Sequence, residues 1–271
     1  MRRALRHIHG ARPATFVRAA FTLLFVAFAA SAPAQTPDAG KLLETAIAFH
    51  GGREALAAMP HLELTGTVES RSAQGNRTVE AVYYERADGG LRSEVTMEFR
   101  GRKITAVTMY DGKMCKRRSR STWDDIPLDE YRERAAHRLP FLVEALARGP
   151  VMAGEGTEAG TDVWRIEVPD GRAKAVLSLA KDDGRLVALE YPGTEAEGMG
   201  TKKEIVRKLV FREFHDVHGV KIPADIERFE DGIFDGRERF SKVAVVDEWD
   251  ESWLQVPDPR RRFIPGEELA F

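Results

Sequence analysis

Histidines are the residues of this chain whose types and spacing come nearest to a catalytic or metal site. Five of the seven lie beyond residue 34, at positions 50, 61, 137, 215 and 218. Only His215 and His218 are near enough in sequence to share a metal ion. Three-residue spacing brings two imidazoles together on a helix, but on a strand such residues point to opposite faces. A strand pattern precedes His215 and a turn signal, His218-Gly219, follows, so we predict exposed imidazoles at a hairpin turn.

Short motifs for other chemistry are absent from the sequence. It contains no G-x-S-x-G, no H-E-x-x-H, no Walker loop and no G-x-G-x-x-G. Residues 231–236 resemble part of a calcium loop but lack its alternating oxygen ligands and distal glutamate, so they predict a hairpin tip. The single cysteine, Cys115, excludes an internal disulfide and Cys-based metal clusters. We therefore predict no catalytic residue, no metal, no cofactor and no enzyme activity.

A basic stretch surrounds Cys115. Residues 113–120 include five positive charges, at Lys113, Lys116, Arg117, Arg118 and Arg120. One interpretation is a solvated edge strand whose charges discourage pairing with another sheet. The other is a contact surface for anionic lipid headgroups or an acidic partner. The net charge of −2 argues against nucleic acid as that partner.

The first 34 residues have the layout of a secretory signal peptide. They carry five arginines and no acid, and the remaining 36 basic residues face all 43 acidic ones, a net charge of −7. Residues 19–30 are a hydrophobic run too short to span a bilayer, and the small residues Ala32 and Ala34 precede the predicted cut. We predict a soluble periplasmic protein beginning at Gln35, with an uncleaved membrane anchor as the alternative.

Hydrophobic periodicity predicts a mainly β (α+β) fold. Thr36 and Pro37 signal the start of a helix that ends at His50-Gly51-Gly52. Residues 62–69 and 91–100 then alternate between apolar and polar, as half-buried antiparallel strands do, and turn signals recur about every ten residues. A second helical segment, 128–148, interrupts the strands and is expected to kink near Pro140.

These patterns predict an unclosed antiparallel β-barrel of about eleven strands. The N-terminal helix and the kinked helical segment are expected to cover its open face as a lid. No linker divides residues 35–256, which we predict to be one domain. An irregular tail is expected at 257–271, which contains three prolines and three consecutive arginines.

The apolar faces of these elements are the remaining candidates for function. A curved sheet capped by helices either fills its interior or leaves a cavity for an apolar ligand, and the sequence leaves both open. The candidate ligand-lining residues are Leu64, Val68, Val82, Tyr84, Val95, Met97, Phe99, Phe141, Leu142, Leu146, Trp164, Ile166 and Leu179.

Six short motifs give the chain a family resemblance. They are AFHGG at 48–52, LELTG at 62–66, YDG at 110–112, DVWRI at 162–166, DDGRL at 182–186 and HGVKIP at 218–223. In this order, and with a strand closing on Trp253 and Pro257, the chain resembles the outer-membrane lipoprotein-sorting superfamily of LolA- and LolB-like carriers. The resemblance implies an unclosed barrel with a helical lid and a hydrophobic concavity that takes acyl chains.

The sequence thus favours a periplasmic carrier that shields an acyl chain or another lipophile from water. Its expected partners are a lipid or lipoprotein acyl chain and a membrane-associated donor or acceptor protein. The alternative is a periplasmic sensor or scaffold that uses the same fold to bind a protein partner. An exposed apolar patch, rather than an enclosed cavity, would favour that alternative.

Export through a cleaved signal peptide can be checked by intact mass. We expect the periplasmic protein of an expressing bacterium to begin at Gln35, because small residues occupy the two positions that a signal peptidase reads before the cut. Mass spectrometry of that fraction measures it. A full-length mass in the membrane fraction would contradict the prediction and indicate an anchor.

Overall fold

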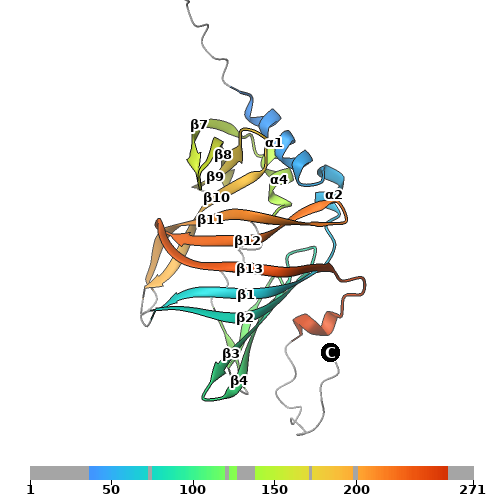
Figure 1. Ribbon diagram of the computed structural model, residues 1–271, viewed down its shortest axis with the longest axis vertical. Helices are drawn as coiled ribbons and strands as arrows, with labels where there is room; N and C mark the ends of the chain where they lie inside the picture. The colour runs from blue at the N-terminus through green and yellow to red at the C-terminus, as the bar shows by residue number, and fades with distance from the viewer. Residues whose placement is uncertain are drawn as a thin grey trace, which may run out of the picture. The chain divides into compact units, whose positions relative to one another are not determined.

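The computed structural model describes residues 37–72, 75–119, 122–126, 138–170, 173–197 and 201–255, all within the compact unit Thr36–Phe271. The predicted signal peptide, the first part of the predicted helical segment (128–137) and the predicted C-terminal tail lie outside the described residues. In what is described, one antiparallel sheet carries short helices on one of its faces (Figure 1).

Thirteen strands form this sheet within the described ranges. They are β1 (Leu62–Ser72), β2 (Gly75–Glu85), β3 (Leu91–Phe99), β4 (Arg102–Tyr110), β5 (Cys115–Ser119), β6 (Thr122–Asp125), β7 (Val151–Glu158), β8 (Thr161–Asp170), β9 (Ala173–Ala180), β10 (Leu186–Glu197), β11 (Thr201–Val217), β12 (Val220–Glu230) and β13 (Ile233–Val245).

The strand order is β6-β5-β4-β3-β2-β1-β13-β12-β11-β10-β9-β8-β7, so the sheet does not close. Pairing of β1 with β13 joins the two halves of the chain. The unclosed antiparallel architecture predicted from the sequence is confirmed, with two strands more than expected. Edge strand β6 is short, and edge strand β7 is largely exposed. A strand with no buried face shows no alternation of apolar and polar residues in the sequence.

The N-terminal helix α1 (Ala39–Phe49) begins two residues later than the Thr36-Pro37 signal suggested. The side chain of Asp38 accepts a hydrogen bond from the backbone N–H of Lys41 at 2.9 Å and is the N-cap. The apolar face of α1 is buried through Leu43, Ala46 and Ile47. This face packs toward the sheet, because these residues belong to the same hydrophobic cluster as the inward residues of the strands.

His50, at the end of α1, fastens this helix to two strands. Its ring is 0% exposed; Nε2 lies 3.3 Å from the backbone N–H of Leu186, and Nδ1 lies 3.0 Å from the carbonyl oxygen of Lys221. A backbone N–H can only donate, so Nε2 accepts the hydrogen bond from Leu186 and carries no proton. The proton of the neutral ring is therefore on Nδ1, which donates it to the carbonyl oxygen of Lys221. The imidazole is therefore held neutral and in one tautomer.

The glycine after His50 has an equally specific role. Gly51 has φ +114°, and a Cβ there would lie 2.5 Å from the carbonyl oxygen of Gly219. Only glycine allows this close approach between the end of α1 and the turn from β11 to β12. The two motifs around His50 and His218 are therefore parts of one contact.

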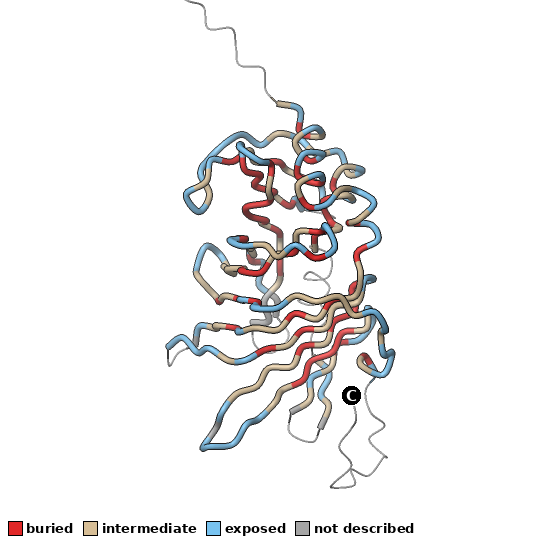
Figure 2. The backbone as a smooth tube through the Cα atoms, turned by 45° about the vertical axis from the view of Figure 1, so that its right-hand side comes forward, coloured by how far each residue is buried: buried red, intermediate tan, exposed pale blue. Residues whose placement is uncertain are grey.

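Two more helices lie on the same face of the sheet: α2 (Arg53–Ala57) and α4 (Phe141–Ala147). Their buried residues, Leu56 in α2 and Phe141, Leu142 and Ala145 in α4, join the cluster of α1 and the strands. We call this helix-bearing face the inner face. Burial runs along the helices and the middle of the strands, while hairpin tips are exposed (Figure 2).

A 3₁₀ helix, η1 (Glu251–Leu254), packs near β3. The side chain of Asp250 caps it by accepting from the Ser252 N–H at 2.8 Å. Within the described ranges, no helix is long and apolar enough to cross a membrane.

Burial of His50 predicts a pH-dependent stability. Loss of hydration lowers its pKa from 6.5 to about 4, with the Lys221 ammonium adding to the effect and the hydrogen bond to Lys221 and Asp183 opposing it. Between these two pH values the unfolded chain binds a proton that the folded protein does not. The free energy of unfolding should therefore fall by about 3 kcal/mol as the pH drops from 6.5 to 4.

Urea denaturation at pH 7.5, 6, 5 and 4 measures this effect. His50→Gln removes the titrating group and should flatten the profile by that amount, while lowering stability at pH 7.5. His218→Asn changes an exposed histidine on the turn facing α1 and should keep the wild-type profile. Equal profiles for the wild type and His50→Gln would show that His50 does not bind its proton this weakly.

Candidate functional site

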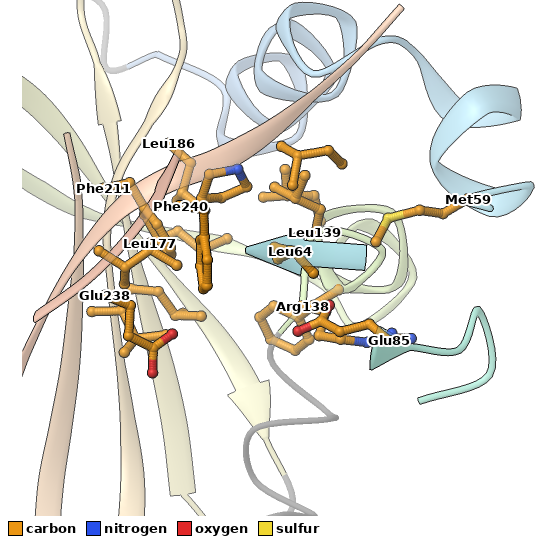
Figure 3. Close-up of a pocket in the computed structure, with 17 residues that line it drawn as sticks. Met59, Leu64, Glu85, Arg138, Leu139, Leu177, Leu186, Phe211, Glu238 and Phe240 are labelled. Atoms are coloured by element: carbon orange, nitrogen blue, oxygen red, sulfur yellow. The ribbon is translucent and has the colours of Figure 1, made fainter. Parts of the chain in front are cut away.

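A cavity lies on the inner face, between α4 and the strands β1, β9, β10, β11, β12 and β13 (Figure 3). The open space between its side chains is about 750 Å³ including the part in contact with solvent, and about 100 Å³ of it admits the centre of a water molecule. Its lining residues are Met59, Leu64, Glu85, Arg138, Leu139, Phe141, Leu142, Leu177, Leu186, Leu189, Leu209, Phe211, Ile222, Pro223, Ile226, Glu238 and Phe240.

Only three lining residues are charged. Figure 3 shows Glu85 and Arg138 together on one side and Glu238 on another. The guanidinium of Arg138 donates to the carbonyl oxygens of Arg86 at 2.9 Å and Ala87 at 2.8 Å, which ties the start of α4 to the turn after β2. The rest of the lining is aliphatic or aromatic, so the cavity suits an apolar ligand.

Glu238 is a buried carboxylate in the cavity wall. It is 2% exposed and accepts a hydrogen bond from Arg228 Nη1 at 2.6 Å. Arg228 also lies 3.4 Å from Asp235. A carboxylate at this depth stays charged at low cost only while an arginine is beside it.

Three of the predicted lining residues do line the cavity: Leu64, Phe141 and Leu142. Val68, Ile166 and Leu179 are buried in the adjoining core, and Val95 and Leu146 pack against that core half-buried. Trp164 is half-buried on the same face of β8 as Ile166, with the Lys181 ammonium 4.2 Å from its ring centroid. The side chain of Phe99 lies outside what the structure describes.

Val82 and Tyr84 do not reach the inner face, which corrects the prediction for β2. The residues of β2 that belong to the inner core are Val79, Ala81 and Tyr83, so Val82 and Tyr84 point the other way. Tyr84 packs instead against Trp253 of η1, with ring centroids 4.6 Å apart. The sequence misled because residues 81–84 are apolar or aromatic in both alternations, and one residue of register exchanges the two faces.

Most of the lining comes from β9 to β13, from which the sequence prediction had selected Leu179 alone. Leu177, Leu186, Leu189, Leu209, Phe211, Ile222, Ile226 and Phe240 lie on β9 to β13. These apolar residues alternate with polar ones along each strand, and this alternation could have been used to select them from the sequence. The alternation does not indicate which element covers the apolar face of a strand. It could not show that α4 would lie over these strands rather than over β2 and β3.

The residues that the sequence analysis considered as metal ligands lie in or next to turns between strands. His218 lies at the turn between β11 and β12 with φ +52°, as predicted, but His215 is half-buried with Nε2 3.1 Å from the Phe240 carbonyl oxygen. Asp231 and Gly232 form the turn between β12 and β13. Within the described ranges, no group of three or more His, Cys, Asp or Glu side chains is placed to hold a metal ion.

The basic stretch is not at the edge of the sheet. Strand β5, which contains Cys115 to Ser119, pairs with β4 on one side and β6 on the other. The short strand β6 is the edge, so the interpretation of the basic residues as an edge guard is wrong for β5. Cys115 itself is buried in the inner core.

Comparison with known proteins identifies solved structures with a similar fold. No family model matches the chain, and no curated protein matches its sequence. Among solved structures, a LolA superfamily protein from Nitrosomonas europaea superimposes with a TM-score of 0.52 at 11% identity, covering 81% of this chain and 98% of that one. The chain shares the fold of that protein. The resemblance seen in the motifs is confirmed at this level.

Two further solved structures are similar to the chain. An outer membrane lipoprotein-sorting protein domain from Vibrio parahaemolyticus has a TM-score of 0.49 at 14% identity, covering 80% of this chain and 97% of that one. A DUF1329 family protein from Desulfovibrio piger has a TM-score of 0.47 at 12% identity, covering 81% and 98%. In this LolA-like fold the cavity is built by this chain's own residues.

The Glu238–Arg228 pair predicts strong coupling in the cavity wall. Arg228→Leu leaves the Glu238 carboxylate buried without its arginine and should cost about 3 kcal/mol of unfolding free energy. The double variant Arg228→Leu/Glu238→Leu removes both charges and should regain most of that loss. Urea denaturation of the two single variants and the double variant measures the coupling energy. Additive losses would mean that the two side chains do not stabilise one another.

Proposed function

We propose that this protein is a periplasmic carrier that binds an acyl chain, of a lipid or a lipoprotein, in the cavity between α4 and the sheet. The observation that carries the proposal is the cavity itself: fourteen of its seventeen lining residues are apolar, and residues of α4 form one of its walls. Its position on the inner face of a LolA-like fold supports the same function.

Desolvation would supply the affinity. Moving an acyl chain from water to an apolar lining contributes roughly 0.8 kcal/mol for each buried CH₂ group. Flexible and aromatic side chains, such as Met59, Phe211 and Phe240, can follow chains of different shape. The proposal therefore predicts that the cavity accepts acyl chains of different structure, with an affinity that rises with the number of CH₂ groups buried.

Release would require the covering layer to move or a partner to compete for the ligand. Burial of the acyl chain stabilises only the bound state. Transfer of the ligand therefore needs a second conformation of the protein with lower affinity for it. The only short helix over the cavity that the structure describes is α4, and Arg138 at its start is tied to the turn after β2. A membrane-associated donor or acceptor protein is the expected partner in loading and release.

Binding of a fluorescent fatty acid tests the proposal. We expect the delipidated protein to bind the probe with one site, and native mass spectrometry of protein purified from the periplasm to show a bound acylated molecule. Leu209→Trp places a larger side chain in the cavity and should weaken binding about tenfold or more, because the added volume occupies the ligand's space.

Val206→Trp is the matched control. Val206 lies on β11 as Leu209 does, but it is 50% exposed and points to the opposite face. It should bind the probe as the wild type does. An empty protein that fails to bind the probe, or equal binding by the two tryptophan variants, would reject the cavity as the ligand site.

A further inference from the structure

Two of the three charged lining residues form one side of the cavity. Glu85, at the end of β2, and Arg138, just before α4, lie together there, apart from Glu238 (Figure 3). Both are half-buried, whereas Glu238 is 2% exposed. Glu85 and Arg138 are thus the charged lining residues that keep contact with solvent, and we call them the polar end of the cavity.

Arg138 has one hydrogen-bond donor that no described residue accepts. Its two terminal nitrogens, Nη1 and Nη2, donate to the carbonyl oxygens of Arg86 and Ala87 and so hold the guanidinium in one orientation. Its third nitrogen, Nε, is buried and has no acceptor among the residues that the structure describes. A charged N–H buried without an acceptor costs free energy, so a ligand that supplies an oxygen there gains affinity.

Glu85 offers hydrogen-bond acceptors beside this donor. It follows Ala81 and Tyr83 in the inward alternation of β2, so its side chain lies on the inner face. Its carboxylate makes no hydrogen bond or ion pair with the residues that the structure describes. An ionised carboxylate only accepts hydrogen bonds, so it fits a hydroxyl or an amide N–H of a ligand and repels a second carboxylate.

The charges around the polar end do not select an anion. Arg86, in the adjoining turn, pairs with Asp88 at 2.7 Å and with Glu251 at 3.0 Å. The charge of Arg138 is opposed within the cavity by the carboxylate of Glu85. An anionic headgroup would be attracted by Arg138 and repelled by Glu85, whereas a neutral group that both donates and accepts hydrogen bonds satisfies the two side chains together.

We propose that the polar end binds a neutral linkage of the ligand, in which an ester carbonyl accepts from Nε of Arg138 and a neighbouring hydroxyl donates to Glu85. The ligand class is therefore the acylglycerols, with the acyl chain against the apolar lining and the glycerol at the side that keeps contact with solvent. This inference rests on the proposed function and specifies the headgroup of its ligand. Glu238 is unsuited to this role, because it is buried and already accepts from Arg228.

Two probes with the same acyl chain test the headgroup. Monododecanoylglycerol is a neutral ester with hydroxyl groups, and dodecanoate is an anion at pH 8.5. Each is titrated below its critical micelle concentration to displace a fluorescent fatty acid from the delipidated protein. The wild type should bind the monoacylglycerol about tenfold more tightly, since it gains two hydrogen bonds at the polar end and avoids repulsion by Glu85.

Glu85→Gln should allow the anion to bind. Glutamine has the size of glutamate, and its carbonyl oxygen still accepts from a hydroxyl, but it carries no charge. Binding of dodecanoate should tighten about tenfold, because its carboxylate then meets the charge of Arg138 alone, while monododecanoylglycerol binding stays within about twofold of the wild type. Such a gain of affinity cannot result from loss of folded protein.

Glu80→Gln is the matched control. Glu80 lies on β2 as Glu85 does, but it is exposed, points to the outer face and pairs with Lys103 at 3.5 Å. This change removes the same charge from the same strand and should leave both affinities unchanged. The double variant Glu85→Gln/Arg138→Gln should bind dodecanoate no more tightly than the wild type, and thermal denaturation checks that it is folded.

Four results would overturn the inference. The wild type binds dodecanoate as tightly as monododecanoylglycerol; Glu85→Gln leaves dodecanoate binding unchanged; the folded double variant keeps the gain; or Glu80→Gln tightens dodecanoate binding as much as Glu85→Gln does, which would show a general effect of charge. Failure of the proposed function is distinct, because then the wild type binds neither the fluorescent fatty acid nor either probe.

Discussion

One buried imidazole holds the covering layer of this protein to its sheet. His50 accepts a hydrogen bond from Leu186 on β10 and donates one to Lys221 on β12, so the end of α1 is fixed across β11 as well. Because both ring nitrogens are occupied and no water reaches the ring, the imidazole has one orientation and stays neutral. Gly51 completes the contact by letting two backbones meet where no side chain fits.

The position of the cavity follows from that contact. With α1 fixed over the middle strands, α4 packs against α1 and α2, and its residues Phe141 and Leu142 face strands from both halves of the chain. Pairing of β1 with β13 brings Leu64 and Phe240 into the lining of one cavity, although they are far apart in sequence. A curved sheet and short rigid helices cannot interdigitate everywhere, and empty apolar space is left between them.

On each face of the sheet a buried carboxylate is paired with an arginine. On the outer face Arg237 pairs with the buried carboxylate of Asp225, and Arg212 pairs with Glu227. On the inner face the carboxylate of Glu238 is paired with Arg228.

The sequence by itself determined the fold class, because alternation along residues 62–69 and 91–100 requires a sheet with one buried face. It also selected Leu64, Phe141 and Leu142. Only the tertiary structure decided which alternation of β2 faces inward, since residues 81–84 are apolar in both, and that β9 to β13 supply most of the cavity. The physical reason is that a strand's own pattern defines its two faces, whereas the partner that covers each face is set by packing between distant segments.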